Sequence, residues 1–504
     1  MLRLATQRPQ WRALLALLAT IIAPILLAPE VRAQAGAAGP IGAPFHWAES
    51  PAPGYVRYSD VVDGFGWVEL GTGVSARVVP SYSSDPTLEI VLDAPLSGHP
   101  TLPEVFLLQI PREFNQLPLN QRRLVVAFHP FGVSHKSPFN GSRLPEECDR
   151  RGLMLLSPFG LSQTHFGNVA SQESLDAVLA LLHQTLPFDP EQVYTAGFSM
   201  GGTSALSYAM RHQDPEGLRI AGVICHTGTI DVIDDYETGD AFLQPVIEDA
   251  LGGSPTDQPF AYERINPGRL SSPTAYFADQ VAVWNLIDVP IYFHLNVSDP
   301  NLDLLQHNLA LHDFLSTRGF NVTLDLADTA QGLPKNCIGI VGSSPSVHSW
   351  CTLVAANALD FVEGAVAPGP VPQSASVIEI YADREDRYRF TEVLELDDDV
   401  VGRFRVSFPK GGSNLLGVHS IRGVRELALD FETTGLNAGQ PASITTWSND
   451  VKATTLILRG YPSAPSLVLV NGGQPVSWSY DAGSNNLTVQ ATSNGAFGLI
   501  EILP

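Results

Sequence analysis

Hydrophobic residues along the chain follow three successive patterns. Between residues 66 and 110, short apolar runs are separated by Gly, Pro, Ser and Asp clusters, which predicts an antiparallel entry into a sheet. Its strands are predicted at Gly66 to Leu70, Leu88 to Leu92 and Val105 to Ile110. From Leu124 onward, buried-type runs alternate with helical patterns, which is typical of βα units on a parallel sheet. These strands are predicted at Leu124 to Phe128, Leu153 to Ser157, Val193 to Ala196, Ile220 to Cys225, Ile291 to Val297 and Val322 to Leu326.

A helical period supports the connections between these strands. Over Ser171 to Thr185, the residues Leu175, Val178, Leu179 and Leu182 recur at helical spacing. This stripe would cover one face of the sheet, so we expect a core helix there.

The third pattern begins after a change in composition. A helix is predicted at Val354 to Val362, and residues 363–376 are rich in Pro and small residues, which is typical of a linker. Residues 377–504 carry short β-type runs with turns at about ten-residue spacing, which predicts an all-β sandwich. Its strands are expected to include Gly402 to Phe408, Thr454 to Arg459, Ser466 to Val470, Val476 to Tyr480 and Leu487 to Ala491.

The first 33 residues have the pattern of a secretory signal peptide. Basic residues precede an apolar run from Ala13 to Ala28, and Val31-Arg32-Ala33 offers small residues at a cleavage site. The alternative is an uncleaved membrane anchor, but the run is short for a bilayer span and is broken by Pro24. We therefore predict export to an extracellular or periplasmic location, with no membrane span after cleavage. The catalytic part would then extend from residue 34 to residue 362, beginning with a leader rich in Ala, Gly and Pro.

Composition limits the class of partner. The 504 residues contain 29 Lys plus Arg against 52 Asp plus Glu, a net charge of -23. A nucleic-acid ligand, which requires clustered basic side chains, is therefore not expected. The length fits two or three packing units.

The segment Gly197-Phe198-Ser199-Met200-Gly201 matches the G-x-S-x-G pattern. The pentapeptide alone is a weak signal, but here it follows a short buried strand and precedes a helical pattern over Thr203 to Arg211. A serine on such a strand-to-helix turn projects its hydroxyl above the sheet, where a substrate carbonyl can reach it. Ser199 is therefore the candidate nucleophile, and the alternative is a Gly-rich turn with a helix-capping serine.

A serine nucleophile needs a base and a carboxylate that orients the base. His348 lies in a Gly/Ser/Pro loop between the last predicted strand and the final helix, so we expect it to be the base. Asp299 directly follows the strand at Ile291 to Val297 and is the expected acid, with Asp303 as its rival. The chain order Ser199, Asp299, His348 is that of α/β-hydrolases, which have a mostly parallel sheet with helices on both faces.

The tetrahedral intermediate of such chemistry needs backbone donors for its oxyanion. One expected donor is the N–H of Met200, the residue after the nucleophile. The second should lie in the loop His129-Pro130-Phe131-Gly132, where we choose Phe131. We expect His129 to tie this loop to the sheet by a hydrogen bond and not to take part in the chemistry.

These motifs resemble those of a known family. The stretches His129 to Gly132, Pro187 to Tyr194, Gly197 to Gly202 and Val347 to Trp350 look like secreted α/β-hydrolase esterases of the polyhydroxybutyrate depolymerase and feruloyl or acetylxylan esterase type. The resemblance covers about residues 120–362, and the family usually has His-Gly where this chain has His129-Pro130. It implies hydrolysis of carboxylic esters, and the appended β-domain suggests a polymeric or surface-bound substrate.

Other activities stay open at this point. Leu251 to Pro255 and Tyr262 to Arg264 resemble a segment of secreted prolyl-oligopeptidase-type peptidases, so a serine peptidase is the alternative enzyme. A third interpretation is a binding or surface protein whose hydrolase domain is inert. The intact Ser199, Asp299 and His348 set argues against this last interpretation.

Four cysteines allow two bridges in an oxidising compartment. Cys337 and Cys351 bracket His348, and we favour a bridge between them because it would close a small loop around the base. Cys148 and Cys225 are left as a second bridge or as two buried thiols.

No cofactor is expected, because the chain lacks H-E-x-x-H, C-x-x-C and P-loop patterns. A structural Ca²⁺ is conceivable at the acidic clusters 231–240 and 397–399, although solvated loops are favoured because EF-hand spacing is absent. Trp350 and Trp284 are either pocket or core residues. Trp447, Trp478 and Tyr480 are either a flat binding face or, as we favour, core residues of the second domain.

Overall fold

The structure of the chain is a computed structural model that describes most of residues 66–504, together with two short strands, β1 (His46–Trp47) and β2 (Tyr55–Val56). The stretches of residues 66–504 outside the described part are 80–81, 84–86, 112–113, 240, 273–274, 277–281, 329–331, 334–336, 338–346, 371–375, 449–452, 472 and 492–496. The predicted signal peptide and most of the leader after it also lie outside the described residues. Among the helices that the structure describes, none is both long and apolar enough to cross a membrane.

The largest sheet has ten strands in the order β14-β13-β10-β9-β7-β8-β6-β5-β4-β3. Their bounds are β3 Val68–Gly71, β4 Val74–Val79, β5 Thr87–Leu92, β6 Glu104–Gln109, β7 Leu124–Phe128, β8 Met154–Pro158, β9 Val193–Phe198, β10 Ile220–His226, β13 Ile291–Asn296 and β14 Val322–Ala327. The strands from β14 to β8 pair in parallel, and those from β8 to β3 pair antiparallel. The predicted antiparallel entry into a parallel sheet is thus confirmed, with β4 added to the predicted strands.

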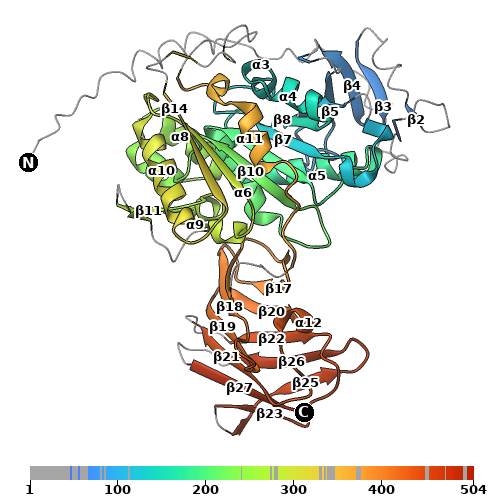
Figure 1. The fold of residues 1–504 in the computed structure, drawn as a ribbon, viewed down its shortest axis with the longest axis vertical. Helices are drawn as coiled ribbons and strands as arrows, with labels where there is room; N and C mark the ends of the chain where they lie inside the picture. The colour runs from blue at the N-terminus through green and yellow to red at the C-terminus, as the bar shows by residue number, and fades with distance from the viewer. Residues whose placement is uncertain are drawn as a thin grey trace, which may run out of the picture. The chain divides into compact units, whose positions relative to one another are not determined.

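Helices cover this sheet on both faces because its central strands are apolar on both sides (Figure 1). The helices have the bounds α3 Ser137–Gly141, α4 Leu144–Arg151, α5 Val169–Thr185, α6 Met200–Arg211, α7 Val232–Thr238, α8 Leu243–Leu251, α9 Pro259–Glu263, α10 Leu302–Ser316 and α11 Ala355–Val362. Along β7, Leu124 and Val126 join one buried cluster, which includes residues of α5 and α6. Val125 and Ala127 join another cluster, which includes residues of α4 and α11. This alternation is the two-residue period of a strand buried on both faces.

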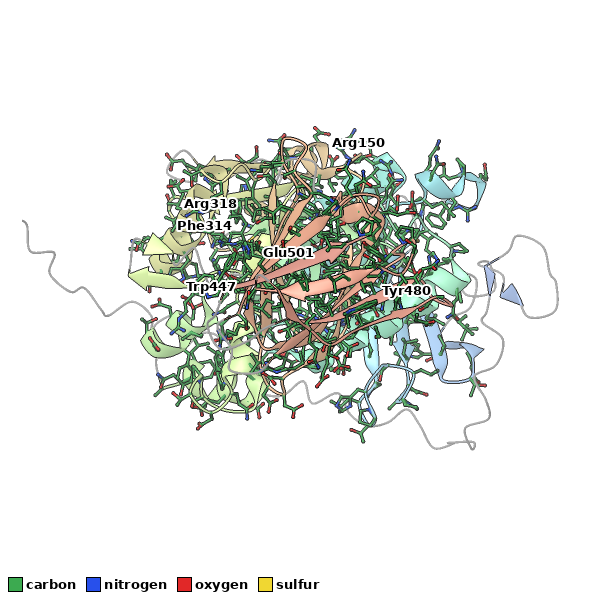
Figure 2. The ribbon with its side chains drawn as sticks, turned by 90° about the horizontal axis from the view of Figure 1, so that it is seen from below. Arg150, Phe314, Arg318, Trp447, Tyr480 and Glu501 are labelled. Carbon is green, nitrogen blue, oxygen red and sulfur yellow. A yellow bond between two sulfur atoms is a disulfide. The ribbon has the colours of Figure 1, made fainter. Side chains whose placement is uncertain are left out.

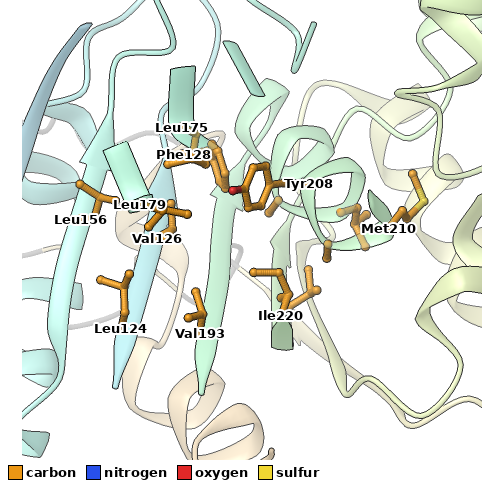
Figure 3. Close-up of a cluster of buried hydrophobic side chains, with 14 of the residues drawn as sticks. Leu124, Val126, Phe128, Leu156, Leu175, Leu179, Val193, Tyr208, Met210 and Ile220 are labelled. Atoms are coloured by element: carbon orange, nitrogen blue, oxygen red, sulfur yellow. The ribbon is translucent and has the colours of Figure 1, made fainter. Parts of the chain in front are cut away.

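The predicted stripe on α5 is part of the first of these clusters. Leu175, Val178, Leu179 and Leu182 are all buried there. Figure 3 shows Leu175 and Leu179 over the strands that carry Val126 and Leu156. The helix is therefore a core helix, as its spacing predicts.

The C-terminal residues form two further sheets. One has seven strands in the order β15-β18-β19-β21-β27-β23-β24, and the other has six in the order β16-β17-β20-β22-β26-β25. Side chains from both sheets share a single buried cluster. The strands of these two sheets have the bounds β15 Val377–Ala382, β16 Arg387–Tyr388, β17 Thr391–Leu396, β18 Gly402–Ser407, β19 Leu415–Arg422, β20 Val424–Asp430, β21 Ala442–Ser448, β22 Thr454–Arg459, β23 Leu467–Val470, β24 Gln474–Pro475, β25 Trp478–Asp481, β26 Asn486–Ala491 and β27 Phe497–Leu503. A short helix, α12, spans Phe431–Thr434.

The three aromatic residues singled out in this region have different surroundings. Trp478 and Tyr480 pack against the shared cluster, as the core interpretation predicts. Trp447 is 44% exposed, so it is not a core residue. Trp447 and Tyr480 lie on opposite sides of these strands in Figure 2.

The start of the Pro-rich segment is held against the part of the chain that contains the ten-stranded sheet. The Ala367 N–H donates to the Glu191 carbonyl at 2.9 Å, and Arg219 donates to the Pro368 carbonyl at 2.6 Å. Immediately after β15, buried Asp383 lies 2.8 Å from the nearest nitrogen of both Arg211 and Arg264. Because burying a carboxylate is costly unless cations face it, this cluster ties the β-rich part firmly to α6 and the loop after α9.

Candidate active site

Ser199 occupies the turn between β9 and α6. Its backbone has φ 56° and ψ -124°, a conformation that non-glycine residues rarely adopt. The turn is held on both sides, because Ser199 N–H donates to the His226 carbonyl at 3.0 Å and Thr229 N–H donates to the Ser199 carbonyl at 3.2 Å. A strained serine between a strand and a helix is the predicted arrangement for a nucleophile.

Glycines are needed around this turn for reasons of space. A Cβ at Gly197 would lie 1.8 Å from the Gly201 carbonyl oxygen, and one at Gly201 would lie 2.2 Å from the Phe128 carbonyl oxygen. Both contacts are with backbone, which cannot move aside cheaply. The G-x-S-x-G pattern is therefore a packing requirement of this tight turn.

Asp299 and His348 lie in contact. Asp299 Oδ2 is 2.7 Å from His348 Nδ1, and the carboxylate side chain is 1% exposed against 21% for the imidazole. The other carboxylate oxygen accepts the Asn301 N–H at 2.9 Å, which fixes the orientation of the group. Asp303, the rival acid, lies in the first turn of α10 instead.

His348 lies beside the turn that carries Ser199. Its ring centroid is 4.5 Å from that of Phe198, the residue before Ser199. Phe198 in turn contacts the rings of His226 and Trp350 at 4.5 and 5.8 Å. One side of the His348 imidazole thus packs against buried aromatic rings.

Two anchors hold the chain just after His348. His226 Nε2 lies 2.9 Å from the Ser349 carbonyl oxygen, which makes it a donor to that carbonyl. Cys351 is disulfide-bonded to Cys337. His226 was not among the residues that the sequence singled out, although its place at the end of β10 resembles that of Asp299 after β13.

The two expected oxyanion donors lie at the start of α6 and after β7. Met200 is the first residue of α6, where a backbone N–H has no acceptor within the helix. Phe131 lies in the turn after β7, and this turn is held by a 2.9 Å hydrogen bond from Gly132 N–H to the Gln163 carbonyl. The Phe131 ring contacts Phe166, which also donates its N–H to Met200 Sδ at 3.4 Å.

His129 has the structural position expected of it, but its partner differs. Its Nδ1 lies 2.9 Å from its neighbour's carbonyl oxygen, that of Pro130, and its Nε2 lies 3.0 Å from the Phe159 carbonyl oxygen. The ring therefore ties the loop to the segment after β8. Burial lowers the pKa of His129, which disfavours the charged ring.

The sequence left open whether the remaining two cysteines form a second bridge or are buried thiols, and the structure has them as buried thiols. Cys148 and Cys225 are both free and both buried. Burial raises the pKa of Cys225 to about 12. Neither thiol is therefore suited to act as a nucleophile at neutral pH.

At least one side chain of each acidic cluster has a protein partner. Asp231 caps α7 by accepting the Asp234 N–H at 3.2 Å, and Asp397 accepts a hydrogen bond from Arg425 at 2.7 Å. Within the part of the chain that the structure describes, no three His, Cys, Asp or Glu side chains are grouped to hold a metal ion.

Trp350 and Trp284 both pack against the buried core, and Trp284 is only partly buried. Trp350 is buried in the cluster that includes Tyr194, Ala196 and Phe198 of β9. Trp284 packs against Phe314 and Phe320, with ring centroids 6.0 and 5.4 Å away.

No protein-family model and no curated protein matches this sequence. Among solved structures, the chain is similar to an S-formylglutathione hydrolase from Agrobacterium tumefaciens, with 12% identity and a TM-score of 0.35 over 50% of this chain and 89% of that one. It is also similar to FphF, a fluorophosphonate-binding serine hydrolase of Staphylococcus aureus, with 15% identity and a TM-score of 0.36 over 50% and 90% of the two chains. A ferulic acid esterase shows 13% identity and a TM-score of 0.35 over 50% and 90%. These similar structures are serine hydrolases and esterases, and each covers half of this chain.

Proposed function

We propose that this chain is a serine hydrolase that cleaves carboxylic esters through an acyl-enzyme. The observation that carries the proposal is the 2.7 Å contact between Asp299 and His348, beside the strained turn that presents Ser199. A buried carboxylate on one imidazole nitrogen leaves the other nitrogen to act as the base.

In the proposed reaction, Ser199 Oγ attacks the ester carbonyl while His348 Nε2 accepts its proton. The oxyanion that forms is stabilised by the N–H groups of Met200 and Phe131. The tetrahedral intermediate collapses to the acyl-enzyme, and His348 returns the proton to the departing alcohol. Water, activated by the same imidazole, then attacks the acyl carbonyl and releases the carboxylic acid and free Ser199.

We further propose that the substrate is polymeric or bound to a surface, and that the enzyme works outside the cytoplasm. The first part is supported by Trp447 and Phe497, which are register partners on β21 and β27 and are 44% and 62% exposed. Such an exposed aromatic pair suits an uncharged polymer surface. The second part is supported by the signal-like first 33 residues and by the disulfide between Cys337 and Cys351.

A fluorophosphonate probe and p-nitrophenyl esters of increasing chain length test the activity. We expect stoichiometric labelling of Ser199 and burst kinetics with the esters, both abolished in Ser199→Ala. Labelling that persists in Ser199→Ala would refute the assignment. A wild-type chain that is neither labelled nor active would favour the inert binding protein instead.

Peptide anilides and polyester films separate the finer alternatives. Faster turnover of prolyl or other peptide anilides than of esters would favour the peptidase. For a polymeric substrate, the Trp447→Ala and Phe497→Ala double variant should lose activity on films while keeping activity on soluble esters. Equal loss on both substrates would contradict a surface-binding role.

A further inference from the structure

Glu104, the first residue of β6, is a fully buried carboxylate with four hydrogen-bond donors around it. Its Oε1 accepts the backbone N–H groups of Phe159 and Gly160 at 2.7 and 3.0 Å. Its Oε2 accepts the Leu161 N–H at 2.9 Å and the Ser174 hydroxyl at 3.1 Å. Three of the four donors thus belong to the backbone turn that immediately follows β8.

The turn that Glu104 holds belongs to a segment that contacts the loop with the expected oxyanion donor. The Phe159 carbonyl lies 3.0 Å from His129 Nε2, two residues before Phe131. The Gln163 carbonyl accepts the Gly132 N–H at 2.9 Å, one residue after Phe131. Both flanks of Phe131 are therefore fixed by carbonyls of the segment after β8.

The same segment also reaches the second donor. The Phe166 N–H donates to Met200 Sδ at 3.4 Å, and the Phe166 and Phe131 ring centroids are 5.8 Å apart. Residues 159–166 thus contact the segments of both Phe131 and Met200, which follow different strands, β7 and β9. Glu104 is the buried carboxyl group that binds the first three residues of this segment.

We propose that Glu104 is the positioning residue of the oxyanion site: it fixes the turn at residues 159–161 and, through that turn, the place of the Phe131 N–H. The inference rests on the proposed function. Glu104 does not touch the substrate, so its effect reaches the reaction only through the backbone. Substituting Glu104 should accordingly weaken transition-state stabilisation, which lowers kcat, and should leave ground-state binding of the substrate unchanged.

Two substitutions of graded severity test the role. In Glu104→Gln, the amide keeps the shape, and its oxygen can still accept from Phe159 and Gly160. The NH₂ group would face the Leu161 N–H as a second donor, so that one backbone hydrogen bond is lost. In Glu104→Ala, all four hydrogen bonds are lost.

Glu363→Gln is the matched control. Glu363 is another largely buried carboxylate, with 16% side-chain exposure, and it pairs with Arg123 at 2.7 Å and with Arg151. Arg123 precedes β7, so this group lies at the sheet edge opposite the one that carries Ser199. Its loss should lower stability and leave catalysis unchanged.

The measurements are kcat and KM on a soluble p-nitrophenyl ester, the inhibition constant of a trifluoromethyl ketone, and the midpoint of urea unfolding. Removing a complete oxyanion donor costs about 100-fold or more, so a displaced donor should cost a part of that. We expect kcat to fall about 3- to 10-fold in Glu104→Gln and at least about 10-fold in Glu104→Ala, with KM changed less than about threefold. The inhibition constant of the ketone, which forms the tetrahedral adduct, should rise by the same factor.

Other results would overturn the inference. If kcat in Glu104→Gln equals that of the wild type while the unfolding midpoint falls as in Glu363→Gln, Glu104 is only a stabilising residue. An increase in KM alone would likewise exclude a role in positioning the oxyanion donor. Should Glu104→Ala fail to fold, the comparison of Glu104→Gln with Glu363→Gln still decides.

Failure of the proposed function gives a different pattern. If a fluorophosphonate does not label Ser199 in the wild type, the proposed function itself is contradicted. A wild type that is labelled, together with a Glu104→Gln variant labelled at the same rate, removes only the role of Glu104.

Discussion

Asp299 Oδ2 lies 2.7 Å from His348 Nδ1, although 49 residues separate them along the chain. The carboxylate is buried and its second oxygen is held by the Asn301 N–H, so neither oxygen can turn away from its partner. In the proposed reaction, this arrangement keeps the proton of a neutral imidazole on Nδ1, so that Nε2 acts as the base.

Asp299→Asn should reverse that tautomer. The amide oxygen would stay on the Asn301 N–H, and the NH₂ group would face His348 Nδ1, which must then accept. Nε2 would carry the proton and could not act as a base. We expect kcat to fall about 10⁴-fold in steady-state assays, with the unfolding midpoint little changed.

Asp303→Asn is the control, because Asp303 lies in the first turn of α10 and is not the partner of His348. Its activity should stay within about twofold of the wild type, since a surface substitution outside the site has little effect. If this variant lost as much activity as Asp299→Asn, the acid would be wrongly assigned.

The pH dependence of the unfolding free energy should report the protonation of Glu104. Burial raises its pKa to about 7, and the hydrogen bonds from Gly160, Leu161, Phe159 and Ser174 oppose that rise. Because the pKa in the folded state exceeds that of the unfolded chain, the contribution to stability is complete below about pH 4.5 and is lost as the pH rises through about 7.

The unfolding free energy of the wild type should therefore fall between pH 5 and pH 8 by up to about 3 kcal/mol more than that of Glu104→Gln. Urea titrations at each pH measure this difference, with Glu104→Gln as the reference at every pH. Parallel pH profiles would show that Glu104 is ionised in the folded state throughout this range.

The bridge between Cys337 and Cys351 should matter for both stability and activity. Its sequence separation is 14, and closing a loop of this size is worth about 3 kcal/mol in the chain-entropy model. The double variant Cys337→Ser, Cys351→Ser should unfold at lower urea. It should also lose kcat, because the segment just after His348 would lose one of its two described anchors and keep the contact of Ser349 with His226.

Cys148→Ser and Cys225→Ser are not suitable controls, since both thiols are buried in the core. Mild reduction of the wild type is an independent test. It breaks the bridge and leaves Cys148 and Cys225 unchanged, because these free thiols are already reduced. If reduction with dithiothreitol changed neither kcat nor the unfolding midpoint, the bridge would have no role in holding His348.

Asp383→Asn should destabilise the chain strongly. It would leave Arg211 and Arg264 buried without their shared carboxylate, and breaking such a cluster typically costs about 3 to 5 kcal/mol. Equilibrium urea unfolding measures the loss. Glu216→Gln removes an exposed partner of Arg387 and should cost less than about 1 kcal/mol. Equal losses in the two variants would contradict a buried role for Asp383.

The sequence by itself determined the elements whose signal is local. The apolar runs at Leu124 to Phe128 and Val193 to Ala196 match β7 and β9, and the stripe on α5 matches its buried face. The turn at Ser199 was also predictable, because the glycines around it answer a short-range steric need. Such signals lie within a few residues and survive whatever packs against them.

Tertiary structure alone decided which distant groups meet. A single sequence could not distinguish Asp299 from Asp303 with certainty, since their carboxylates follow the same strand and differ only in direction. Nor could it show that Glu104 holds residues 159–161, that His226 holds Ser349, or that Asp383 lies between Arg211 and Arg264. Each of these contacts joins residues far apart in the chain. The cost of burying a polar or charged group depends on the hydrogen-bond partners that the folded chain brings around it.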